Sequence, residues 1–140
     1  MRRAGCHWTR RTAGSAGPSE LLAAIALDAR DRIHERVRGI LAGNLPVFDD
    51  FFASHADRFE WAHPDGGCVA FPRYLGPEGV EVFCRELVET EGVLLLPASI
   101  YQSRLAPVPA DRFRIGIGRR DPRPALEATA RFLAGRRRPS

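Results

Sequence analysis

A long stripe of apolar residues at helical spacing is the feature that most constrains the fold of this chain. The helix is predicted to begin at Pro18, because proline suits the first helical position and Glu20 favours the positive end of the helix dipole. Apolar residues then recur every three or four positions, while charged residues occupy the other face. These positions are Leu22, Ile25, Ala29, Ile33, Val37, Ile40 and Leu41. Pro46 is expected to kink or break the helix, whose apolar stripe resumes and runs to His55.

Beyond this helix the pattern changes to short strands and two further helices. Alternating residues on either side of a turn at 64–67 predict a hairpin of strands 58–63 and 68–71. The remaining predicted elements are a helix over 77–90, strands over 93–96 and 113–118, and a helix over 124–134. This order implies an α+β fold: a small, mostly antiparallel sheet with helices on one side, preceded by a long N-terminal helix. Residues 1–17 have little apolar content and are expected to be poorly ordered, so residues 18–140 are predicted to form the domain.

Charge and hydropathy argue against two classes of partner. The net charge is +4, but arginines alternate with acidic residues, as in segment 28–32, which is typical of a solvated helix face. We therefore expect no nucleic-acid partner. No apolar run is long enough to span a membrane, and no hydrophobic segment follows the basic N-terminus as in a secretory signal. The expected location is the cytoplasm.

The cysteines and histidines do not predict a metal site. Cys6, Cys68 and Cys84 are widely spaced, and no Cys/His cluster has zinc spacing. Cys68 and Cys84 lie in apolar runs and are predicted to be buried free thiols. The histidines are best interpreted as surface residues, and Ser99, Ser103 and Cys84 lack a nucleophile motif such as G-x-S-x-G. These histidines are His7, His34, His55 and His63.

The sequence contains no lysine, because all 21 residues counted as Lys or Arg are arginine. A Schiff base with a carbonyl cofactor needs a lysine amine, and the guanidinium of arginine stays protonated in proteins. On its own, the chain therefore cannot hold a cofactor or substrate as a lysine imine.

Arg114 is the strongest candidate for a binding residue. Alternation in its strand places its side chain on the face opposite to Phe113 and Ile115. A guanidinium there needs an anion, because an unpaired buried charge is strongly destabilising, and its planar fork suits a carboxylate. The anion is either an acidic side chain of this chain or a ligand carboxylate. Gly116 and Gly118 lack the third glycine of a dinucleotide loop, and glycine in a strand more often marks a close approach by backbone or ligand.

Four segments in order resemble the C-terminal part of class I/II, fold-type-I pyridoxal-phosphate (PLP)-dependent aminotransferases. They read PSELL at 18–22, WAHPDGGCVAFPR at 61–73, GVLLLPAS at 92–99 and FRIGIGR at 113–119. Each motif alone is short, but the four occur in the family's order with matching helices between them. The resemblance covers about residues 17–135, which is nearly the whole chain.

The resemblance implies a role for several residues. Arg114 falls where the family has the arginine that binds the substrate α-carboxylate, and Arg119 matches a second arginine of that motif, with a structural role. Segments 64–67 and 97–101 would lie near the domain closure, and the long helix would connect two domains. The complete enzyme would transfer an amino group between an amino acid and a 2-oxo acid, use PLP and form a homodimer.

The residues that bind PLP in the family lie in a large domain that residues 1–16 do not resemble. We therefore expect a C-terminal fragment that binds no PLP alone and is inactive alone, with apolar positions on the long helix left exposed. Two alternatives remain open at this point. The chain is either a non-catalytic binding module, or one half of a split enzyme whose large domain is a separate polypeptide.

Overall fold

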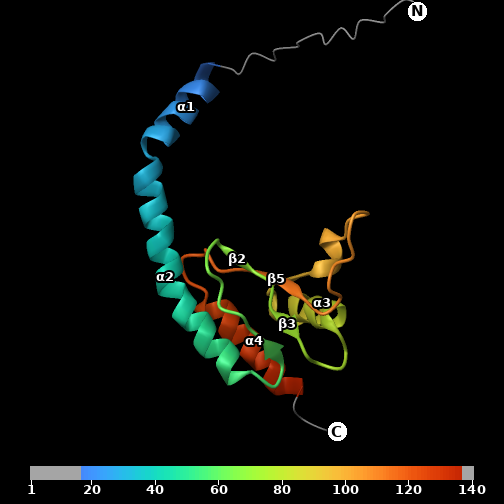
Figure 1. Cartoon of the computed structure of the whole chain (residues 1–140). Coiled ribbons are helices and arrows are strands. Elements are labelled where there is room, and N and C mark those ends of the chain that lie inside the picture. The colour runs from blue at the N-terminus through green and yellow to red at the C-terminus, as the bar shows by residue number, and fades with distance from the viewer. Residues whose placement is uncertain (1–16, 137–140) are drawn as a thin grey trace, which may run out of the picture. The chain divides into compact units, whose positions relative to one another are not determined.

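The computed structural model of the chain describes residues 17–136. The chain divides into two compact units, Met1–Arg36 and Val37–Ser140. The prediction of poor order for residues 1–17 lies outside the described residues, except at Gly17, which begins a helix. Figure 1 gives the element labels used below.

The described part of the first unit is helical, with α1 at Gly17–Asp28 followed by the start of α2 at Arg30–Ser54. Hydrogen bonds from Ala29 N to Ile25 O (3.1 Å) and from Ile33 N to Ala29 O (3.0 Å) keep the helical pattern across the junction. No residue of α1 is buried, and Leu22 is 66% exposed. The expected exposure of apolar positions on this helix is confirmed.

Pro46 does not break the long helix, although the sequence predicted a kink or a break at this residue. Pro46 lies inside α2, and the interruption occurs instead at Ala29. A proline removes one backbone donor, and here the next turns are held by Phe48 and Phe52, whose side chains are buried in the core of the second unit. Packing of these rings offsets the lost hydrogen bond.

The second unit contains a three-stranded sheet and a separate two-stranded ladder, all antiparallel. The three-stranded sheet has the order β2-β5-β4, and the ladder joins β1 to β3. The strands are β1 Phe59–Glu60, β2 Val69–Ala70, β3 Arg73–Tyr74, β4 Leu96–Pro97 and β5 Phe113–Gly116. Pro97 was predicted to stop the strand over 93–96, but β4 includes it and begins only at Leu96.

The predicted hairpin between segments 58–63 and 68–71 is wrong. β1 pairs with β3, and β2 pairs with β5. The intervening chain leaves the sheet because Trp61 Nε1 donates a hydrogen bond to Asp49 Oδ1 of α2 (2.7 Å), and His63 Nδ1 lies 2.9 Å from Asp49 Oδ2. These contacts hold segment 61–67 against the helix instead of against β2.

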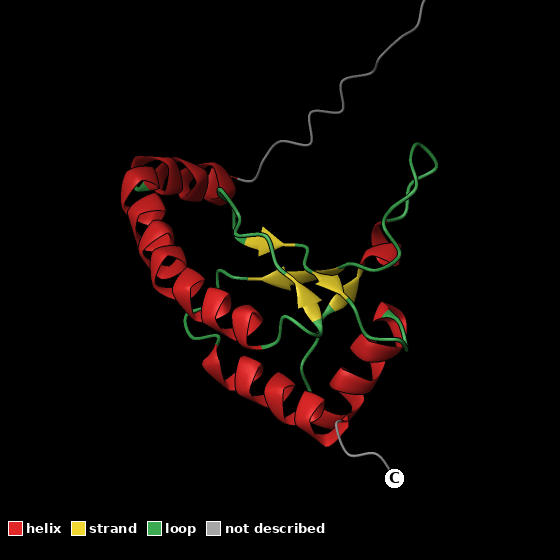
Figure 2. Ribbon diagram, turned by 60° about the horizontal axis from the view of Figure 1, so that its bottom comes forward, coloured by secondary structure: helices red, strands yellow, loops and turns green. Residues whose placement is uncertain are grey.

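Two further α-helices and a short 3₁₀ helix complete the second unit: α3 at Val80–Glu91, η1 at Ala98–Tyr101 and α4 at Arg123–Arg136. Gly92 ends α3 in the left-handed conformation (φ 70°), with its N–H bonded to Val88 O, as its position predicted. Figure 2 shows α3 and α4 lying together on one side of the strands. The predicted α+β class, with helices beside a small antiparallel sheet, is confirmed.

The core of the second unit is built around aromatic rings. Phe83 of α3 is fully buried, stacks on Tyr74 with ring centroids 4.2 Å apart, and meets Phe59 and Phe113 at 5.7 and 5.8 Å. Offset and edge-to-face ring pairs of this kind are stabilising beyond the area they bury. They join α3 to β1, β3 and β5.

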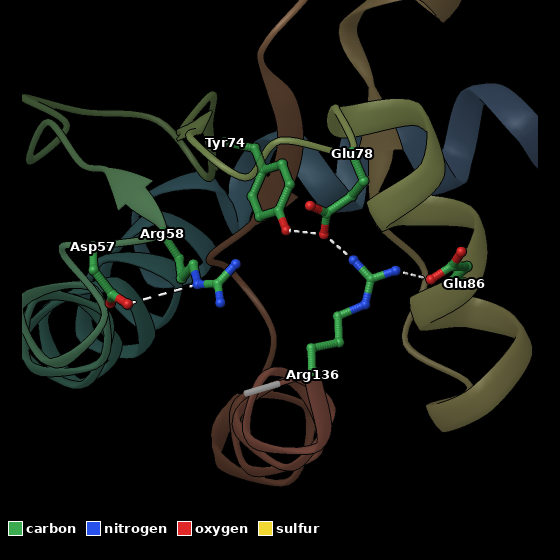
Figure 3. Close-up of polar contacts among 6 residues, drawn as sticks. All are labelled: Asp57, Arg58, Tyr74, Glu78, Glu86 and Arg136. Atoms are coloured by element: carbon green, nitrogen blue, oxygen red, sulfur yellow. Dashed lines mark hydrogen bonds and ion pairs between the residues drawn. The ribbon is translucent and has the colours of Figure 1, made fainter. Parts of the chain in front are cut away.

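A network of charged groups fastens the end of α4 to the rest of this unit (Figure 3). Arg136 forms ion pairs with Glu78 and with Glu86 of α3, and its guanidinium lies 4.8 Å from the Phe132 ring centroid. The Tyr74 hydroxyl donates to the same Glu78 carboxylate at 2.5 Å, and burial raises the pKa of Tyr74. The network explains why α4 extends to Arg136, two residues beyond the predicted end.

The two cysteines that the structure describes differ in exposure, which corrects one prediction. Cys84 is buried, as predicted, and burial raises the pKa of its thiol to about 12. Cys68 is exposed, because it precedes an edge strand beside the 64–67 turn. The apolar run around Cys68 therefore did not indicate burial of the thiol itself.

The two thiols should react at very different rates. Since the thiolate is the nucleophile, we expect iodoacetamide at pH 8 to label Cys68 about a thousandfold faster than Cys84 in the folded chain. Peptide mapping by mass spectrometry separates the two sites, and labelling in urea serves as the control, because it should make the rates similar. Equal labelling of both sites without denaturant would contradict the structure.

Candidate functional site

The candidate site lies on the face of the three-stranded sheet opposite the core. Arg114 is paired with Leu96 of β4, and the β2–β5 register (Val69 with Gly116, Ala70 with Ile115) continues to place Phe71 opposite Arg114. Residues directly opposite in an antiparallel pair point to the same face. Phe113, the neighbour of Arg114, is 1% exposed and faces the core. Arg114 therefore points away from the core, as alternation predicted.

Arg114 has free hydrogen-bond donors. Its Nη1 donates to the hydroxyl of Tyr101 at 3.3 Å, and Tyr101 comes from η1, which follows β4. Within residues 17–136, no carboxylate lies within ion-pair distance of Arg114. The intramolecular salt bridge, one of the two interpretations of this residue, is therefore not seen in the described part of the chain. A half-buried guanidinium with open donors suits a carboxylate from outside.

An aromatic pair borders this guanidinium. The rings of Tyr101 and Phe71 meet edge to face, with centroids 6.0 Å apart, and both side chains are partly exposed. Figures 1 and 2 show that the loop after η1 extends away from the strands, so this side of the sheet is not covered by that loop. The site thus combines the Arg114 guanidinium with an apolar border.

The two glycines of the strand segment differ in what surrounds them. A side chain at Gly116, on the same face as Arg114, would meet nothing within 4 Å among the described residues. At Gly118 a Cβ would lie 3.1 Å from the Cβ of Cys68. A close neighbour is therefore present at Gly118, just after β5, and it is a side chain instead of the predicted backbone or ligand, while the surface over Gly116 is open.

The other predicted residues do not join Arg114. The side chain of Arg119 has no partner among residues 17–136, and its backbone carbonyl accepts a hydrogen bond from Asn44 Nδ2 at 2.5 Å. Segment 64–67 lies beside α2, next to Leu41 and Leu45. Only segment 97–101 meets the predicted site, because it carries Tyr101.

Asp49 holds segment 61–67 and makes this contact sensitive to acid. Hydrogen bonds from Trp61 and then from His63 lower the pKa of Asp49. A carboxyl with a lowered folded-state pKa stabilises the fold above its unfolded pKa of about 4, and this stabilisation is lost as the pH falls through the folded value. The contact is therefore present at neutral pH and lost in acid.

Asp49→Asn should flatten the dependence of stability on pH below about pH 4. Urea unfolding, followed by circular dichroism, measures the free energy of unfolding at each pH. The matched control is Asp50→Asn, an exposed carboxylate on the same helix. If both variants keep the slope of the parent chain, Asp49 does not couple stability to pH.

The described residues contain no cluster of metal-ligating side chains. Among residues 17–136, no group of three or more His, Cys, Asp or Glu side chains could hold a metal ion. None of the helices in this range is long and apolar enough to cross a membrane. The sequence has no lysine to bind PLP covalently, so the residues present do not fit that cofactor.

Comparison with known proteins gives a consistent set of neighbours. No protein-family model matches the sequence. Capreomycidine synthase from Streptomyces vinaceus is 39% identical over 64 residues, which is 46% of this chain and 14% of that protein. The PLP-dependent cyclase OrfR superposes with a TM-score of 0.76 and 29% identity, over 91% of this chain and 34% of that one. The solved structures that resemble this chain are PLP-dependent enzymes.

Two aminotransferases share the fold at lower identity. A PLP-dependent aminotransferase from Streptococcus suis matches at 24% identity and a TM-score of 0.73, over 89% of this chain and 32% of that one. The α-aminoadipate aminotransferase LysN from Thermus thermophilus matches at 16% identity and a TM-score of 0.66, over 84% of this chain and 30% of that one. The chain thus spans about a third of the length of each solved structure.

Proposed function

We propose that residues 18–140 form the small domain of a PLP-dependent enzyme related to class I/II aminotransferases, and that Arg114 binds the α-carboxylate of its amino-acid substrate. The cyclase and aminotransferase neighbours support the enzyme class. In the complete enzyme, another domain would carry the lysine that binds PLP. An amino acid and a 2-oxo acid would be the substrates, and the enzyme would be a homodimer.

The proposal rests on the position and hydrogen bonding of Arg114. Its guanidinium is on the open face of the sheet, and Tyr101 is its hydrogen-bond partner in place of a carboxylate. Because arginine presents two parallel N–H groups, it orients a carboxylate as well as attracting it. Tyr101 restrains the guanidinium, and the Phe71 ring contacts Tyr101. The contribution of this chain is therefore substrate binding and orientation.

The exposed apolar residues of α1 support a covering domain. Leu21, Leu22, Ile25 and Leu27 are each more than half exposed. Several exposed large apolar side chains on one short helix are typical of an interaction site. A domain that binds PLP and packs on α1 would bury these side chains.

Carboxylate binding by Arg114 is tested by titrating the isotopically labelled chain with pentanoate and following backbone amide shifts by NMR. We expect saturable shifts in segment 112–116, little response to pentanamide, and a loss of at least about tenfold in affinity in Arg114→Gln. Arg85→Gln removes an exposed arginine on α3 and controls for net charge. Equal binding by the parent chain and Arg114→Gln would overturn the proposal.

A further inference from the structure

A second arginine lies on the same face of the sheet as Arg114. Arg112 precedes it by two residues and pairs with Arg73 in an isolated bridge that continues the β2–β5 register. Alternate residues of an extended strand share a face, and their Cα atoms lie about 7 Å apart. The outer surface therefore carries two guanidinium groups side by side along one strand.

Arg112 also has N–H groups that are free to donate further hydrogen bonds. Its Nη1 donates to the backbone carbonyl of Phe71 at 2.9 Å, which uses one of five N–H groups. Within residues 17–136, no carboxylate forms an ion pair with Arg112. The nearby acidic groups form ion pairs with Arg73 instead: Arg73 binds Asp111 Oδ2 at 2.5 Å and Glu60 Oε2 at 3.2 Å. The hydrogen bond to Asp111 is the main reason that the pKa of Arg73 is raised.

The two arginines belong to one connected cluster. Arg112 contacts Phe71, the Phe71 ring meets Tyr101, and Tyr101 accepts a hydrogen bond from Arg114. Two cations of like charge repel each other unless an anion lies between them or beside them. A ligand with two negative groups on a short apolar linker would satisfy both guanidinium groups and place its linker beside the aromatic pair.

We propose that Arg112 is a specificity-determining residue that binds a second carboxylate, so that the site selects dicarboxylic amino acids or 2-oxo acids. This inference rests on the proposed role of Arg114, which binds the first carboxylate. Arg112 supplies the second contact, and Phe71 fixes the position of its guanidinium through the backbone carbonyl.

Glutarate and pentanoate form a matched pair of probes, because they share a five-carbon skeleton and differ by one carboxylate. In NMR titrations of the full chain at constant ionic strength, we expect glutarate to bind about fivefold more tightly than pentanoate. Arg112→Gln should reduce glutarate affinity to that of pentanoate and leave pentanoate affinity unchanged. Arg112→Lys should restore part of the difference in affinity between glutarate and pentanoate, and Arg85→Gln should leave that difference unchanged.

The outcomes separate the two proposals. If glutarate binds no more tightly than pentanoate while Arg114→Gln weakens both, Arg112 has no such role and Arg114 keeps its own. If Arg112→Gln weakens both ligands equally, Arg112 only supports the structure, and the inference is overturned. If neither ligand shifts the amides of segment 112–116, the proposed role of Arg114 fails, and the inference fails with it.

Discussion

Leu87→Ala is expected to lower the free energy of unfolding by about 2–5 kcal/mol. Leu87 is 0% exposed and lies on the buried face of α3 within the main core. Removing its three terminal carbons forfeits their burial and leaves a cavity that the surrounding rings cannot fill without moving. Domains of this size have a total stability of about 5–15 kcal/mol, so the loss would be a large share of it. Urea unfolding followed by circular dichroism measures the change.

Leu105→Ala makes the same chemical change at an exposed site and is the matched control. Leu105 is 96% exposed, in the loop that follows η1. Its replacement should alter the free energy of unfolding by no more than about 0.5 kcal/mol. A similar loss in both variants would mean that the core is not centred on α3 as described.

Asn44 is the second position where a large effect is expected. Its buried Nδ2 donates to Ile117 O (2.8 Å) and to Arg119 O (2.5 Å), joining α2 to the chain that leaves β5. Asn44→Ala leaves both carbonyls without this donor and should cost about 1–3 kcal/mol. Asn44→Asp should cost more at pH 7, because it places a carboxylate against two carbonyl oxygens.

The order of the two Asn44 variants tests the hydrogen bonds directly. If size alone mattered, Asn44→Asp would be the milder change, because aspartate has nearly the shape of asparagine. Protonation of the new carboxyl restores a donor. The difference in free energy of unfolding between Asn44→Asp and Asn44→Ala should therefore become smaller as the pH is lowered towards 4. Gln102→Ala removes an exposed amide and serves as the control. An Asp variant as stable as the parent would show that these bonds are not formed.

The sequence predicted elements more accurately than pairings, because an element depends on its own residues. The apolar spacing placed α3 and α4 within a few residues of their observed ends. The predicted hairpin was wrong because β2 pairs with β5, which is distant in sequence, and because the side chains of Trp61 and His63 bind Asp49. Local alternation has no information about such contacts.

The same distinction applies to the candidate site. Alternation within one strand was sufficient to place Arg114 on the outer face. Phe71 and Tyr101 were not predicted as its neighbours, because they reach Arg114 through the β2–β5 register and the turn after β4. Two signals in the sequence pointed to residues that were not predicted. Arg112 lies two residues before Arg114 and so falls on the same face of an extended strand, and Asn44 is a polar residue within an apolar stripe.

The ion pairs of Arg136 have a consequence for how this unit opens in its native state. The last turn of a helix usually frays, so its amide hydrogens exchange with solvent at little free-energy cost. In α4, unwinding the last turn would also separate Arg136 from Glu78 and Glu86 and from the ring of Phe132. The final turn of α4 should therefore exchange slowly and together with α3, as one cooperative unit rather than as a loose end.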